Sequence, residues 1–254
     1  MLTSYKNDPK LKKLFVAEIE NHRKQDQIIQ GTYGKENGVW KGCAVGCSIH
    51  SLNIKLGKSY KTDDHSVYEK ELGIPEWLAR LEDTIFEGLP EKDAVNWPTQ
   101  FAKAVPVGVN LGPVKWKFYA YLMKENIERV LTLNISDELK KQVVDAIRGV
   151  LAVHESAIET GIWNESAAWS AAWSAARSAA ASAAWSAARS AESAESAASA
   201  AESAAASAAS AAWSAAWSAA RSAAWSAESA AESAESVAYT KHAKELLRLL
   251  KEAN

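Results

Sequence analysis

A run of serine and alanine from Ser166 to Ser236 constrains this chain more than any other stretch. Tryptophan, arginine or glutamate interrupts the run at intervals, and residues 162–254 contain no glycine or proline. Alanine is the best helix former, and serine is tolerated in helices. The serines recur about every 3.7 residues, close to one helical turn. The spacing therefore predicts helix throughout the segment.

Two arrangements of this helix remain open. The serine spacing changes in the glutamate-rich middle, and a fold-back near residue 197 would set Trp169 opposite Trp225 and Arg177 opposite Trp217. An arginine over an indole face contributes about 0.5–2 kcal/mol. The middle has no glycine, asparagine or proline to make the turn, which leaves one continuous helix as the alternative. We favour the hairpin over the rod.

The aromatic and basic side chains of this segment are candidates for ligand binding. Indole rings stack on flat ligands, arginine pairs with phosphate, and serine hydroxyls form hydrogen bonds. The alternative is that the indoles only fill space between alanine-rich helices, and uniform repeats more often build a scaffold than a site. The candidate residues for a flat, nucleotide-like anion are Trp169, Trp173, Arg177, Trp185, Arg189, Trp213, Trp217, Arg221 and Trp225.

Charge and composition exclude several classes of protein. The formal net charge is −2, so no global basic surface favours nucleic acid. Serine interrupts the alanine blocks, so no apolar run reaches the length of about eighteen residues that a membrane span needs. The first residues lack the apolar core of a signal peptide. Two cysteines are too few for a disulfide framework, and we expect a reducing, cytoplasmic location with no cofactor.

The first 161 residues predict a compact domain of short helices, followed by the repeat tail from residue 162 to residue 254. Asp8 precedes Pro9 as a helix cap, and Ser136 caps a later helix that ends at Gly161. No segment alternates apolar and polar residues as a strand does, so the predicted fold class is all-α. Further helices are expected at residues 68–72, 75–89, 98–105, 114–131 and 239–250, with a loop at 53–62. The last of these helices is leucine-rich and is expected to pack on another helix.

Cys43, Cys47 and His50 share one face if their segment is helical. Three interpretations remain open. The three side chains could hold a metal ion with a fourth ligand such as His22 or His65. One thiol could be a nucleophile near a helix N-terminus, with His50 as its base. The interpretation we favour is packing, because the spacing is not a strong zinc signature and buried cysteine behaves as a small apolar residue.

Two further features have simple interpretations. The glycine-rich loop from Gly31 to Gly42 could cradle an anion, although its spacing matches no phosphate-binding pattern. The acidic residues Asp83, Glu87 and Glu91 are interpreted as a solvated face.

The front half also carries short motifs that resemble a group of bacterial and phage proteins. The motifs are Gly42-Cys43-Ala44-Val45-Gly46-Cys47, Glu71-Leu72-Gly73-Ile74-Pro75 and Ile85-Phe86-Glu87-Gly88-Leu89-Pro90. In that group a similar front half precedes an Ala/Ser/Trp/Arg-rich helical tail that ends in a leucine-rich helix. The resemblance implies a bacterial or phage origin and supplies no activity.

Three hypotheses about function follow. The first is a non-enzymatic protein that binds a small anionic ligand or a protein partner through its Trp/Arg-bearing helices. The second is a thiol enzyme or metal protein centred on Cys43, Cys47 and His50. The third is a structural protein whose Ala/Ser tail drives assembly into a homo-oligomer. We favour the first and expect no catalytic activity.

Overall fold

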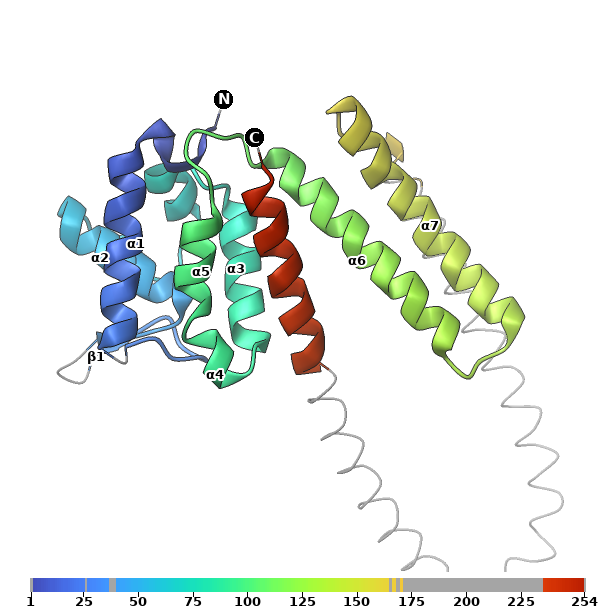
Figure 1. Cartoon of the computed structure of the whole chain (residues 1–254), viewed down its shortest axis with the longest axis horizontal. Helices are drawn as coiled ribbons and strands as arrows, with labels where there is room; N and C mark the ends of the chain where they lie inside the picture. The colour runs from blue at the N-terminus through green and yellow to red at the C-terminus, as the bar shows by residue number, and fades with distance from the viewer. Residues whose placement is uncertain are drawn as a thin grey trace, which may run out of the picture. The chain divides into compact units, whose positions relative to one another are not determined.

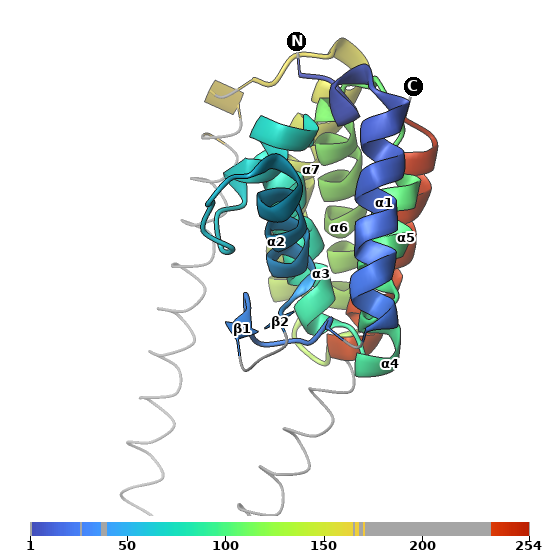
Figure 2. The same cartoon turned by 90° about the vertical axis from the view of Figure 1, so that its left-hand side faces the viewer.

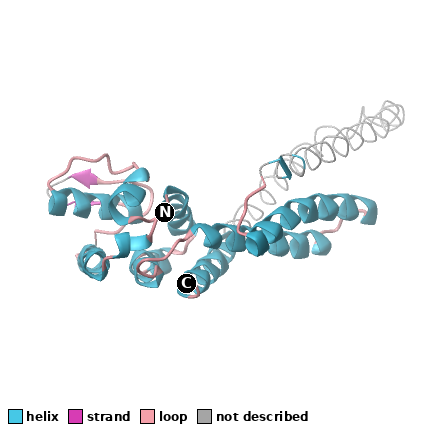
Figure 3. Cartoon of the chain, turned by 90° about the horizontal axis from the view of Figure 1, so that it is seen from above, coloured by secondary structure: helices cyan, strands magenta, loops and turns pink. Residues whose placement is uncertain are grey.

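A computed structural model describes residues 2–25, 27–36, 40–164, 166–167, 170 and 235–253. Helices make up nearly all of the regular structure in these residues, and Figure 3 shows one small pair of strands among them. The all-α fold class is therefore confirmed. The chain divides into two compact units, residues 1–118 with 233–254 and residues 119–232. None of the helices in the described part is long and apolar enough to cross a membrane.

The first unit contains most of the helices (Figure 1). In chain order they are η1 (Ser4–Asn7), α1 (Pro9–Lys24), α2 (Ala44–Leu56), η2 (Tyr68–Leu72), α3 (Glu76–Gly88), α4 (Glu91–Ala94), α5 (Trp97–Ala104) and the start of α6 (Gly112–Thr132). A last helix spans residues 235–251. The strands β1 (Lys35–Glu36) and β2 (Trp40–Lys41) pair antiparallel, which the sequence did not predict because two-residue strands show no alternation.

The core of this unit lies among four helices. α1 packs against α2 and α5, and α3 packs against the same two helices (Figure 2). The largest fully buried side chains include Trp97, Phe86, Phe101, Tyr5 and Tyr68. This packing brings the N-terminus of α2 alongside α3, where the candidate site lies.

Local chemistry sets the ends of these helices. The Asp8 carboxylate accepts a hydrogen bond from the Lys10 amide at 2.8 Å, with Pro9 in the first turn, as predicted. The predicted loop at residues 53–62 is wrong at its start, because α2 continues to Leu56. Asn53 closes the loop that follows instead, since its side-chain amide forms two 2.8 Å hydrogen bonds with the backbone of Tyr60.

The C-terminal helix belongs to the first unit and packs on α3, so the predicted packing on another helix is confirmed. Leu246 and Leu250 on this helix are fully buried. The ring of His242 lies 6.4 Å from that of Phe118, between ring centroids. Figure 1 shows the helix, in red, beside α3. The end of the chain therefore helps to build the unit that its beginning forms.

The second unit contains the rest of α6 and α7 (Asp137–Thr160). Lys124 forms an ion pair with Glu155 at 2.9 Å, so the two helices lie against each other. The predicted cap is confirmed, because the Ser136 hydroxyl accepts a hydrogen bond from the Leu139 amide at 3.3 Å. α7 ends at Gly161, which has a φ of 70°. The domain boundary predicted there stays a prediction, since most of the repeat tail lies outside the described residues.

Candidate metal centre

The three side chains that the sequence grouped have different partners in the structure. Cys43 precedes α2 and caps it, with its Sγ accepting a hydrogen bond from the Gly46 amide at 3.3 Å. The Cys47 thiol lies 3.3 Å from the carbonyl oxygen of Gly42. The ring of His50 stacks on Trp40, with centroids 4.0 Å apart. Of these three side chains, only Cys43 belongs to a group of possible metal ligands found among the described residues.

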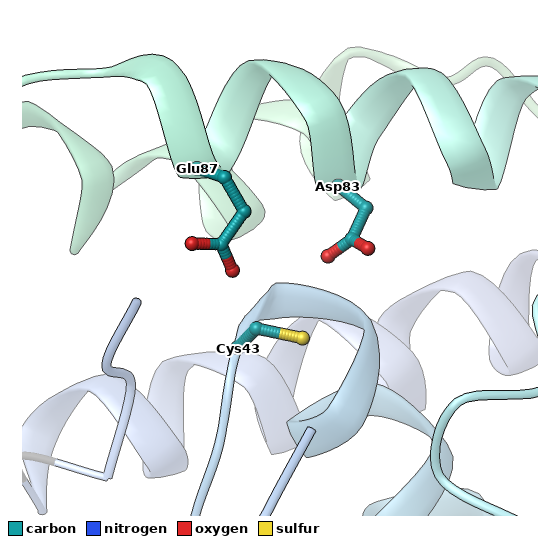
Figure 4. A group of neighbouring side chains, drawn as sticks. All are labelled: Cys43, Asp83 and Glu87. Carbon is teal, nitrogen blue, oxygen red and sulfur yellow. The ribbon is translucent and has the colours of Figure 1, made fainter. Parts of the chain in front are cut away.

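That group consists of Cys43, Asp83 and Glu87. One donor atom from each side chain lies within 4.8 Å of the other two. Figure 4 shows the two carboxylates of α3 above the N-terminus of α2, with the sulfur between the helices. Asp83 and Glu87 are one helical turn apart and therefore project from the same face of α3.

Asp83 holds the centre of the group, and its two oxygens have different surroundings. Oδ2 accepts a hydrogen bond from the Tyr33 hydroxyl at 2.9 Å, and Nε2 of His65 lies 3.1 Å from the same oxygen. Oδ1 is buried and has no hydrogen-bond partner. Only 8% of Asp83 is exposed, so its interpretation as part of a solvated face is wrong. A buried carboxylate oxygen without a partner calls for an explanation.

The glycine-rich loop brings Tyr33 to this position. Gly46 packs directly on the backbone of Tyr33, and a Cβ at Gly46 would clash with the Tyr33 carbonyl oxygen. The Cys43 amide donates a hydrogen bond to the carbonyl oxygen of Thr32 at 2.6 Å. The close packing of Gly46 on this backbone therefore fixes the loop residue Tyr33 beside α3.

Glu87 is held by the same loop. Its Oε2 accepts a hydrogen bond from the Gly31 amide at 2.8 Å, so this amide already serves a carboxylate of the chain itself. Unlike Asp83, Glu87 is exposed, which agrees with the predicted solvated face. The group thus has two buried members and one at the surface.

Acidic groups crowd together here, and the pKa of Cys43, Glu87 and Tyr33 is raised beside the Asp83 carboxylate. Burial and then the Asp83 carboxylate raise the pKa of the Cys43 thiol. Burial also raises the pKa of Glu87, and Asp83 adds to that effect. Burial, followed by the hydrogen bond to Asp83, raises the pKa of Tyr33 to about 12. Among the described residues no lysine or arginine forms an ion pair with Asp83 or Glu87.

Burial also decides the state of the thiols. The sequence predicted that a helix N-terminus could lower a thiol pKa for nucleophilic chemistry. Burial instead raises the pKa of both Cys43 and Cys47, the latter to about 12. The protonated thiol is favoured at neutral pH, so neither cysteine is activated as a nucleophile by its surroundings.

The other predicted ligands lie elsewhere or outside the described residues. Nε2 of His22 lies 2.7 Å from the Ser51 hydroxyl. His65, named as a possible fourth ligand, instead contacts the ligand candidate Asp83. The nine tryptophan and arginine residues predicted to bind a ligand, from Trp169 to Trp225, fall outside the described residues, as do the hairpin and rod alternatives.

In comparisons with known proteins, no family model, no curated protein and no solved structure matches this chain.

Proposed function

We propose that this protein binds a divalent metal ion, of which Zn²⁺ is the best fit, through Cys43, Asp83 and Glu87. The observation that carries the proposal is Oδ1 of Asp83, a buried oxygen with no hydrogen-bond partner. It belongs to a carboxylate that forms a group of possible metal ligands with Cys43 and Glu87. A metal ion would satisfy this oxygen without displacing the partners of Oδ2.

The donor types select the metal. Zn²⁺ binds both cysteine thiolate and carboxylate oxygen, whereas Mg²⁺ and Ca²⁺ take oxygen ligands. Tetrahedral coordination with zinc bond lengths places donor atoms roughly 3.5 Å apart. The donors lie within 4.8 Å of one another, so a small inward movement of the side chains suffices.

The residues around the donors have the arrangement of an outer shell. Hydrogen bonds from outer-shell groups orient metal-bound carboxylates and tune their basicity. Tyr33 and His65 hold Oδ2 of Asp83, and the Gly31 amide holds Glu87. Each carboxylate is thus oriented by a neighbouring group that is not itself one of the three proposed metal ligands.

A bound cation also relieves the crowding of acidic groups, since it favours the charged forms of all three side chains. Coordination deprotonates a thiol outright. Three protein ligands leave a fourth position for water or a ligand, which is the pattern of catalytic rather than structural zinc. A metal-binding thiol has to stay reduced, in keeping with the predicted cytoplasmic location.

The test is Zn²⁺ binding by calorimetry with matched cysteine variants. We expect the full chain to bind one equivalent of Zn²⁺, and Cys43→Ser to weaken binding by about 100-fold or more. Cys47→Ser and His50→Gln are the controls and should bind as the parent does, because neither side chain belongs to the donor group. Equal losses in Cys43→Ser and Cys47→Ser would refute the proposed centre and favour a metal site at Cys43, Cys47 and His50, one of the interpretations that the sequence left open.

The hypothesis of a tail that binds a flat anion remains a separate proposal, supported by the Trp/Arg pattern of the sequence. It predicts a saturable change in tryptophan fluorescence with nucleotides. Phage origin and tail-driven assembly into an oligomer likewise remain proposals drawn from the sequence.

A further inference from the structure

A surface pocket of about 370 Å³ adjoins the proposed metal centre. Asp83 and Glu87 lie on its wall and belong to both features. The remaining lining residues are Thr84, Gly88, Glu235 and Tyr239. Its volume falls within the range of about 300–1,000 Å³ that small-molecule sites occupy. The pocket therefore offers room for a ligand beside the open metal position.

The C-terminal helix forms one side of this pocket. The ring of Tyr239 packs on α3 at Gly88, where a Cβ would clash with the ring. The Tyr239 ring also lies 6.0 Å from that of His242 on its own helix, between ring centroids. Glu235 and Tyr239 are one helical turn apart on this helix, and both line the pocket together with Asp83 and Glu87 of α3.

The lining of the pocket selects for positive charge. Three of its six lining residues are acidic, and none of the six is basic. With Zn²⁺ bound by one thiolate and two carboxylates, the centre keeps one negative charge, and Glu235 adds another. An aromatic ring attracts cations to its face, which Tyr239 supplies here. Asp83, whose buried Oδ1 the proposed metal ion would bind, lies on the wall of the same pocket.

We propose that this pocket binds the ammonium group of a small amine through Glu235 and Tyr239. The inference rests on the proposed function, because the metal engages Asp83 and Glu87 and leaves Glu235 as the carboxylate that pairs with the amine. Anionic ligands are disfavoured in this pocket, whatever the repeat tail binds.

The test uses three probes of similar shape and different charge with the zinc-loaded full chain. Benzylamine should bind, whereas neutral benzyl alcohol and anionic benzoate should bind at least about tenfold more weakly. Glu235→Gln should weaken benzylamine binding about tenfold and leave Zn²⁺ affinity unchanged. The matched control is Glu159→Gln, at an exposed glutamate outside the pocket, and it should change neither affinity.

The two proposals fail in distinguishable ways. If Zn²⁺ binds but the three probes bind equally well, or Glu235→Gln has no effect on benzylamine, the amine pocket is wrong and the metal centre stands. If the chain takes up no Zn²⁺ yet binds benzylamine in a Glu235-dependent way, the metal centre is wrong and the pocket is supported.

Discussion

Tyr33 donates its phenolic hydrogen to Oδ2 of Asp83 at 2.9 Å, across fifty residues of sequence. The raised pKa of Tyr33, about 12, keeps this phenol protonated at neutral pH and therefore able to donate. The contact leaves Oδ1 of Asp83 as the oxygen without a partner. Tyr33, a loop residue, thus determines which carboxylate oxygen of Asp83 on α3 is available to a ligand.

The first prediction concerns this contact. Tyr33→Phe removes the hydrogen bond but keeps the ring, so we expect Zn²⁺ affinity to fall about tenfold, as for other outer-shell losses. Competition with a zinc-binding dye measures the change. Tyr60→Phe, which removes a phenol elsewhere in the same unit, is the control. Unchanged affinity in Tyr33→Phe would show that Asp83 needs no such orientation.

The second prediction concerns pH. Burial raises the pKa of the Cys43 thiol, so the free protein carries a proton there at neutral pH, and metal binding has to release it. Zn²⁺ affinity should therefore rise about tenfold for each pH unit near neutrality. Calorimetry in buffers of different ionisation enthalpy counts the released protons. An affinity independent of pH would mean that Cys43 is not a ligand.

The third prediction concerns Glu82, whose side chain is fully buried. Burial, and secondarily the charge on Asp83, raise the pKa of Glu82 well above its ordinary value of 4.5, although Tyr68 acts in the opposite direction. At pH values between the ordinary and the raised pKa, the folded state therefore keeps a proton on Glu82 that the unfolded state loses. The contribution of this group to the free energy of unfolding is complete at pH values below its ordinary pKa. It declines as the pH rises toward the pKa that Glu82 has in the folded protein.

Glu82→Gln has no such proton to lose. Its free energy of unfolding relative to the parent protein should increase from about pH 5 to about pH 8, by at most about 1.4 kcal/mol per pH unit. Urea denaturation at both pH values measures the difference, and Glu159→Gln at an exposed position should show no such trend. A constant difference between Glu82→Gln and the parent would contradict the raised pKa.

The fourth prediction concerns the approach of α2 to the loop. Gly46→Ala forces a Cβ against the Tyr33 carbonyl oxygen, which is backbone and yields little. We expect a loss of about 1–3 kcal/mol in unfolding free energy. Gly149→Ala lies at an exposed position of α7 and should stabilise the protein by up to about 1 kcal/mol. Equal effects at the two glycines would show that Gly46 has no special packing role.

The sequence predicts the features that depend on neighbouring residues. Asp8 and Ser136 bond to amides two and three residues away, so the cap and its helix are visible in one short window. The leucine-rich end of the chain is also predictable from a short window, because the spacing of its leucines indicates a buried helix face.

The site depends on distant residues and was only partly predictable. Cys43 was a candidate from its spacing to Cys47 and His50, but its two carboxylate partners come from another helix. Asp83 lies in an acidic stretch that is typical of a surface, and its burial results from packing by Tyr33 and His65. No local pattern distinguishes such a carboxylate from an exposed one, because its desolvation depends on the tertiary fold.

The most direct test of the metal centre is X-ray absorption spectroscopy at the zinc edge on the zinc-loaded full chain. The proposed site predicts one sulfur ligand, with the remaining ligands oxygen, and loss of the sulfur contribution in Cys43→Ser but not in Cys47→Ser. Two sulfur ligands, or a sulfur signal that survives Cys43→Ser, would contradict the centre formed by Cys43, Asp83 and Glu87.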